Sequence, residues 1–197
     1  DRSSAASDVY KRQIVSYFEE LRRIYLYEGM SWKYVMDCFL APLHSSNFQK
    51  LFLRMISYNV IDIKMPDISH RETTAWVRAV AATYGKRVGE VAYIFCNDDK
   101  ILEVNRQYLQ HDYFTDIITF DYCEGDMISG DLFISLDTVR SNAELFNKAY
   151  DEELHRVIIH GILHLVGIND KGPGEREIME AAENKALELL KEMQAEK

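Results

Sequence analysis

The chain has 197 residues, a length that suits one packed domain, alone or with an appendage. Its hydrophobic fraction of 47%, with only 9 Gly and 3 Pro, excludes a disordered or collagen-like protein. Its formal net charge of −9 excludes a protein that coats nucleic acid through bulk positive charge. No apolar run approaches the roughly 18 residues of a membrane span and the first residues contain no apolar signal segment, so we expect no membrane association and a cytoplasmic location. Cys38, Cys96 and Cys123 are odd in number and form no C-x-x-C pair, which predicts reduced, mostly buried thiols.

The charge changes sign along the chain. Residues 1–54 carry 8 Lys and Arg against 6 Asp and Glu, whereas residues 55–197 carry 15 against 26. We therefore predict an N-terminal extension over 1–54 and one folded domain over 55–197, with Met55 as a candidate natural start. Residues 1–13 have the composition of a linker or a cloning scar, and residues 14–54 place apolar side chains at helical spacing. The simpler interpretation is a short helical arm, and a partner-binding arm is the alternative.

Beyond residue 55 the apolar periods predict both strands and helices. The strands are expected at 55–62, 90–97, 117–122 and 131–135, and the helices at 70–84 (capped by Ser69), 98–108 (capped by Asp98), 137–148, 151–166 and 174–197. Strands and helices alternate at first, but three helices follow the last pair of strands. This order predicts an α+β fold in which a small mixed β-sheet of about four strands packs with about five helices.

The strongest chemical signal is a pair of histidines four residues apart, His160 and His164, in the apolar segment RVIIHGILHLVGIND. One helical turn holds about 3.6 residues, so the two imidazoles project from the same face and can bind one metal ion. Gly167 is expected to end the helix in a left-handed conformation and to turn Asp170 back toward the histidines. Two histidines and a carboxylate are a ligand set of catalytic zinc sites, which keep the fourth position for water.

Other interpretations of these residues stay open. The two histidines can be ordinary core residues, and Asp170, between Asn169 and Lys171, can be a turn residue. The zinc-protease motif requires a Glu directly after the first histidine as its general base, and Gly161 occupies that position. The missing side chain at Gly161 predicts instead some space beside the metal for a bulky substrate group.

Three segments carry motifs that occur together in one family: TDIITF at 115–120, GDLFIS at 130–135 and HGILHLVGIND at 160–170. They resemble the T-[DN]-V-L-S-F, G-D-[IL]-x-I-S and H-G-x-L-H-L-x-G-x-D-H motifs of the YbeY family of bacterial metal-dependent endoribonucleases. The resemblance implies that His160 and His164 are the first two zinc ligands and that Asp170 stands at the third position, which is His in the family. Zn²⁺ is the implied cofactor, and the carboxylate can shift the preference toward another divalent ion.

The chain departs from the family pattern at two further places. Asn169 replaces an Asp, and Leu109 replaces the arginine of a Y-R-G-K-D-x-P-T segment. Arg106, one helical turn before Leu109, and His111 are the candidates to supply the lost donor to a substrate phosphate. Either of them can also be an ordinary solvated side chain.

The resemblance implies a zinc-dependent, single-strand-directed endoribonuclease that processes the 3′ end of small-subunit ribosomal RNA and serves ribosome quality control, with ribosomal proteins or assembly factors as further partners. A metal at the cluster can stabilise charge on a phosphate oxygen, and either an activated water or the RNA 2′-OH can be the nucleophile. The alternatives are a metallohydrolase of another substrate, which a general-base Glu near the metal would favour, and a non-catalytic metal-binding ribosome-assembly factor, which metal binding without RNA cleavage would favour. The oligomeric state stays open.

Overall fold

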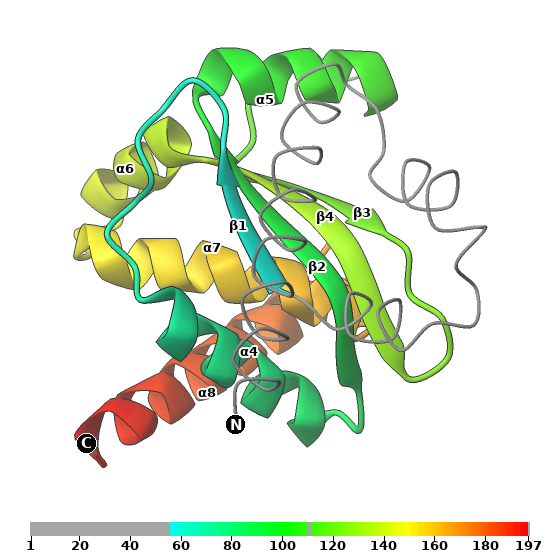
Figure 1. Cartoon of the computed structure of the whole chain (residues 1–197). Coiled ribbons are helices and arrows are strands. Elements are labelled where there is room, and N and C mark those ends of the chain that lie inside the picture. The colour runs from blue at the N-terminus through cyan, green and yellow to red at the C-terminus, as the bar shows by residue number, and fades with distance from the viewer. Residues whose placement is uncertain (1–55, 110–111, 197) are drawn as a thin grey trace, which may run out of the picture. The chain divides into compact units, whose positions relative to one another are not determined.

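The computed structural model describes residues 56–109 and 112–196, which form a four-stranded sheet and five α-helices (Figure 1). The strands are β1 (Ile56–Val60), β2 (Arg87–Cys96), β3 (Ile117–Asp121) and β4 (Met127–Ser135). The helices are α4 (His70–Thr83), α5 (Asp98–Val104), α6 (Leu136–Leu145), α7 (Tyr150–Leu165) and α8 (Glu175–Ala195), and a π-helical turn, η2 (Asn105–Leu109), continues α5. The predicted α+β class is confirmed. The predicted extension over 1–54 lies outside the described residues, so the domain boundary stays a prediction.

The sheet is mixed, with the strand order β1-β2-β4-β3. Strands β1, β2 and β4 are parallel, and β3 is antiparallel to β4, so the predicted strand pair at the end of the sheet is confirmed. Strand β4 begins at Met127 and not at 131, because Met127 and Ile128 pair with Arg87 and Val88 at the start of β2. The sequence pattern misses this part of β4 because Ser129 and Gly130 interrupt its apolar residues.

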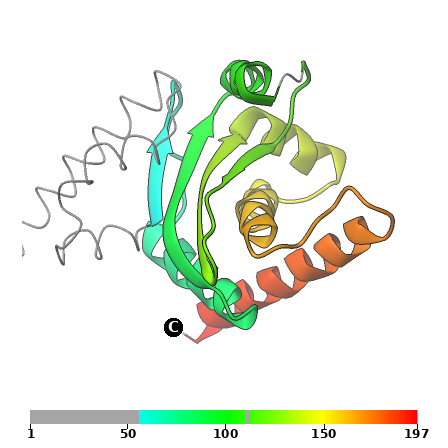
Figure 2. The same cartoon turned by 90° about the vertical axis from the view of Figure 1, so that its right-hand side faces the viewer.

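Helices cover one face of the sheet and enclose the hydrophobic core. Figure 2 shows α6 and α7 on the inner side of the curved sheet, with α8 running beneath α7. On β2, alternate residues Val91, Tyr93 and Phe95 are fully buried in this core, and the Tyr93 hydroxyl donates to the carbonyl of Ile158 on α7 at 3.3 Å. These contacts fix the position of α7 on the sheet.

Helix α7 lies close to the sheet because residue 161 has no side chain. A Cβ atom on Gly161 would overlap the side chain of Leu132 and would lie 2.8 Å from Ile117 Cδ1. Gly161 therefore faces β3 and β4, and the prediction that it leaves space beside the metal is wrong. The physical reason is that the residue following a histidine in a helix lies about 100° around the axis from it, which here is the sheet side.

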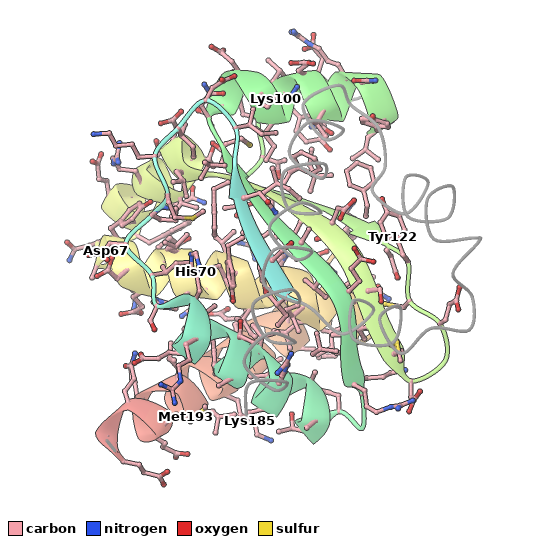
Figure 3. The ribbon with its side chains drawn as sticks, viewed as in Figure 1. Asp67, His70, Lys100, Tyr122, Lys185 and Met193 are labelled. Carbon is pink, nitrogen blue, oxygen red and sulfur yellow. The ribbon has the colours of Figure 1, made fainter. Side chains whose placement is uncertain are left out.

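Of the two predicted N-cap residues, Ser69 of α4 is confirmed and Asp98 of α5 is wrong. Ser69 caps α4 as predicted, and its hydroxyl accepts from the backbone N–H of Glu72 at 3.4 Å. The next residue, His70, is labelled in Figure 3. Its ring stacks on that of Tyr58 in β1, with centroids 4.3 Å apart. The predicted cap of α5 is wrong, because Asn97 holds that position and accepts from the N–H of residue 100.

Asp98 has a different contact from the predicted cap. Its carboxylate accepts hydrogen bonds from the hydroxyls of Ser135 and Thr138, at the start of α6. Asn and Asp are equally good N-caps, so the local sequence alone does not decide between residues 97 and 98. Within the described ranges, no helix is long and apolar enough to cross a membrane.

Candidate metal centre

The two histidines lie in the last two turns of α7, on one face of the helix. The rings of His160 and His164 are perpendicular, with centroids 4.5 Å apart. Their side chains are 20% and 27% exposed, whereas the opposite face of α7 is packed in the core. The helix thus presents both imidazoles at the edge of the core, where an ion and a substrate can reach them.

The chain turns sharply after α7. Gly167 has φ +102°, and its N–H donates to the carbonyl of His164 at 2.9 Å, while the N–H of Ile168 donates to the carbonyl of Leu163 at 2.9 Å. These two bonds form a Schellman motif, in which a left-handed glycine satisfies the last carbonyls of a helix. The predicted left-handed cap at Gly167 is confirmed, and the turn returns Asp170 to the histidines.

The three candidate ligands converge. Asp170 Oδ2 lies 3.7 Å from His160 Nε2 and 3.8 Å from His164 Nε2, and one ligand atom from each residue lies within 4.8 Å of the other two. Zinc bonds of about 2.0–2.1 Å at the tetrahedral angle separate two ligand atoms by about 3.3 Å. The two separations between a histidine nitrogen and Asp170 Oδ2 are thus about half an ångström longer than this spacing, and a nitrogen, nitrogen and oxygen set suits zinc.

The other ring nitrogen of each histidine has an acceptor. His164 Nδ1 is 2.9 Å from the carbonyl oxygen of Ile168, and His160 Nδ1 is 2.7 Å from Glu183 Oε1. Since a carbonyl and an ionised carboxylate can only accept, the Nδ1 atoms carry the protons and donate them. In the neutral form of each ring, the Nε2 atom is therefore left with a lone pair that faces Asp170, which is the state in which histidine binds a metal.

The local charges shift the pKa values of the cluster. Burial alone lowers the pKa of His160, but the hydrogen bond and charge of Glu183, with Asp116 and Asp170, outweigh burial and raise it above the usual value. Burial and the neighbouring His160 lower the pKa of His164. Burial tends to raise the pKa of Glu183, but its hydrogen bonds with His160 and Arg156 lower it overall. Glu183 is thus ionised at neutral pH.

Sequence analysis missed three residues that act on the cluster. Glu183 belongs to α8, Asp116 precedes β3, and Arg156, on α7, donates to Glu183 Oε2 at 2.9 Å. Arg156 is four residues before His160, so the helical spacing that paired the histidines could also have identified it. Glu183 carries no such signal, because tertiary packing alone brings it near. Asp116 belongs to the TDIITF motif, but its motif position alone does not place it near the histidines.

The structure describes one of the two candidate phosphate-binding residues. Arg106, in η2, is exposed and forms an ion pair with Asp112 at 2.6 Å. His111 lies outside the described residues. The structure thus brings together His160, His164 and Asp170, and it records Arg106 in a surface pair with Asp112.

The fold and the cluster define a mixed α+β protein with a candidate metal centre, formed by three residues that could hold an ion, at the end of a core helix. A family model described as "Endoribonuclease YbeY" matches residues 59–191 of this sequence. The chain belongs to the endoribonuclease YbeY family, and the predicted family resemblance is confirmed.

Relatives named "Endoribonuclease YbeY" match almost over their entire length. The protein of Phocaeicola vulgatus is 82% identical over 136 residues, which are 69% of this chain and 99% of the relative. The protein of Bacteroides thetaiotaomicron is 76% identical over 134 residues, which are 68% of this chain and 98% of the relative. Among solved structures, the solution structure of TM1509 from Thermotoga maritima is similar with a TM-score of 0.54 and 28% identity, and the match covers 72% of this chain and 93% of that one.

Proposed function

We propose that this chain is a metal-dependent endoribonuclease of ribosomal RNA maturation whose metal ligands are His160, His164 and Asp170. The observation that carries the proposal is the convergence of the two Nε2 atoms on Asp170 Oδ2, at 3.7 and 3.8 Å, with both Nδ1 atoms held by acceptors. Membership in the endoribonuclease YbeY family supports RNA cleavage as the reaction. The donor set supports Zn²⁺ as the ion, one per chain.

The proposed chemistry is metal-assisted cleavage of a phosphodiester. Zinc, when bound, supplies a Lewis acid that stabilises negative charge on a phosphate oxygen. The protein contributes the geometry: α7 holds two ligands one turn apart, and the Gly167 turn supplies the third. Arg106 and His111 are proposed contacts to the substrate phosphate. Because Arg106 is paired with Asp112, an RNA phosphate would have to replace that carboxylate.

The proposed substrate is single-stranded ribosomal RNA at the 3′ end of the small-subunit RNA, with ribosomal proteins or assembly factors as further partners and the cytoplasm as the location. A metallohydrolase of another substrate is less well supported, because Gly161 replaces the general-base Glu and is packed against the sheet. A non-catalytic assembly factor is also less well supported, because the relatives are named as endoribonucleases.

Metal analysis of a histidine variant tests the proposal. We expect the purified parent to contain about one zinc per chain and to cleave a structured ribosomal RNA fragment, and His160→Ala to retain neither metal nor cleavage, because two ligands hold the ion poorly. His155→Gln is the matched control, since His155 also lies on α7 but contacts Trp76 and the carbonyl of Asp151. Elemental analysis that finds as much metal in His160→Ala as in the parent would remove the basis of the proposal.

A further inference from the structure

Glu183 of α8 lies between two hydrogen-bond donors of α7. Its Oε1 atom is 2.7 Å from His160 Nδ1, and its Oε2 atom accepts from Arg156 Nη1 at 2.9 Å. The Glu183 side chain is only 11% exposed. Helix α8 packs against α7 (Figure 2). Because Arg156 and His160 are one turn apart on α7, a single carboxylate from α8 contacts both of them.

This arrangement determines which nitrogen of His160 carries the proton. A carboxylate accepts but does not donate, so the proton of the neutral ring stays on Nδ1 and the lone pair stays on Nε2. Arg156 offsets the charge of Glu183, so the carboxylate can be buried in an ionised form without any help from a metal ion. The orientation of His160 is thus set by the packing of α8 on α7.

We propose that Glu183 is a positioning residue of the metal centre, which fixes the tautomer and ring orientation of His160, and that Arg156 holds the Glu183 carboxylate in place. The inference rests on the proposed metal site and extends it to α8, whose side chains supply none of the three candidate ligands. Partners of this kind that orient a metal-binding histidine typically contribute about 10- to 100-fold to metal affinity.

The variant Glu183→Gln distinguishes positioning from simple packing. Glutamine has nearly the volume of glutamate but only one acceptor atom, since its other terminal atom is an NH₂ donor. Arg156 has only donors, so the amide oxygen pairs with Arg156 and the NH₂ group faces His160 Nδ1. That contact favours a proton on Nε2, which is the nitrogen that must bind the metal. A residue that only fills space would tolerate this change.

We expect Glu183→Gln to bind Zn²⁺ about 10- to 100-fold more weakly than the parent in competition with a chromophoric chelator. We also expect the visible absorption of bound Co²⁺, which reports ligand geometry, to change. Asn184→Ala is the matched control, because it removes the other contact of Arg156, a 2.9 Å hydrogen bond from Nη2 to Asn184 Oδ1. This control is expected to keep the parental affinity, and an equal loss in it would contradict a role specific to Glu183.

Two double variants test the tautomer argument directly. In Arg156→Met/Glu183→Gln the amide oxygen is free to accept from His160 Nδ1, so part of the lost affinity should return. In Arg156→Met/Glu183→Leu no acceptor remains, so binding should stay weak. Thermal melts of the metal-free proteins show whether Glu183→Gln folds. If it does not, the comparison of the two double variants still tests the positioning role of Glu183.

The outcomes separate this inference from the proposed function. A parent protein that binds neither Zn²⁺ nor Co²⁺ would overturn the metal site itself and this inference with it. A parent that binds metal, together with a Glu183→Gln variant of equal affinity and unchanged Co²⁺ absorption, would overturn the positioning role alone. So would equal affinities in the two double variants.

Discussion

Asp170 is the candidate ligand that no helix holds. Its Oδ2 atom lies almost equally far from the two histidine Nε2 atoms, at 3.7 and 3.8 Å, and its side chain is 30% exposed. In the family resemblance this position is histidine, so the carboxylate adds a negative charge to the site. The charge of the third ligand affects how strongly a bound ion can acidify a neighbouring water.

We expect Asp170→His to bind zinc as tightly as the parent or more tightly, and its RNA cleavage to extend to lower pH. A neutral ligand in place of an anion leaves more positive charge on the ion, which lowers the pKa of any group that the ion activates. Zinc titrations and pH profiles of cleavage measure both effects. Asn169→His, at the preceding residue, is the control and should change neither. If Asp170→His matches the parent in both measurements, Asp170 is a turn residue and not a ligand.

The described cysteines are poor nucleophiles. Cys96 is fully buried and Cys123 half-buried, and burial raises the pKa of the Cys96 thiol to about 12 and that of the Cys123 thiol to about 11. The thiolate is the reactive form, so only a very small fraction of either thiol is reactive at pH 8. The prediction of reduced, mostly buried thiols agrees with the free, fully buried Cys96 and in part with the half-buried Cys123, and Cys38 lies outside the described residues.

We predict that native protein carrying Cys38→Ser reacts much more slowly with an aromatic disulfide reagent at pH 8 than a free thiol does. Since these pKa values are raised, the rate should increase as the pH rises toward them. Denatured protein is the control and should release two equivalents of the chromophore at once. Rapid reaction of the native variant would show that Cys96 or Cys123 is accessible.

Helix α7 connects the core to the candidate site. Its buried face packs on β3 and β4, and its other face carries both histidines, so any change in the distance between helix and sheet also moves the ligands. Gly161 sets that distance, because a Cβ atom there would overlap Leu132 and approach Ile117 Cδ1. The role of this glycine is therefore in packing.

We expect Gly161→Ala to destabilise the protein by about 1–3 kcal/mol, although alanine is the better helix former by about 1 kcal/mol. The added methyl group meets a packed core that has no space for it. Urea denaturation of the parent, of each single variant (Gly161→Ala and Leu132→Ala) and of the double variant forms a double-mutant cycle. We expect the double variant to lose less unfolding free energy than the two single variants lose in sum. A Gly161→Ala variant more stable than the parent would contradict the close packing.

At the scale of the whole molecule, the family match and the predicted boundary nearly coincide. The family model begins at residue 59, and relatives that are matched over 98–99% of their own length cover only 68–69% of this chain. Within residues 56–109 and 112–196, the core includes Trp76, Leu132, Ile158 and Leu187. We therefore continue to propose residues 55–197 as an independent domain.

Deletion of residues 1–54 should leave metal content and RNA cleavage intact and should shift the melting temperature by only a few degrees. A peripheral arm contributes little to the main core, and a change of about 1 kcal/mol shifts Tm by roughly 2–8 °C in domains of this size. Thermal melts and cleavage assays of the full and shortened chains measure this. Loss of cooperative melting in the shortened chain would show that Phe18, Leu21 or Trp32 packs into the domain.

The sequence alone determined those features that depend on short-range geometry. Residues four apart in a helix share a face, so the pairing of His160 and His164 followed from their spacing. A glycine at the end of an apolar helix predicts a left-handed turn, so the position of Asp170 beside them also followed. Alternation of apolar residues and the order of elements predicted the α+β class.

Tertiary structure alone decided the contacts between distant segments. Glu183 reaches His160 across 23 positions of sequence because α8 packs on α7, and no local pattern in either helix requires that pairing. The environment of Gly161 could not be predicted either, because its neighbour Leu132 belongs to another element. The expected space beside the metal is in fact a close contact between helix and sheet. Local periodicity specifies which face a side chain occupies, whereas the partner on that face depends on how whole elements pack.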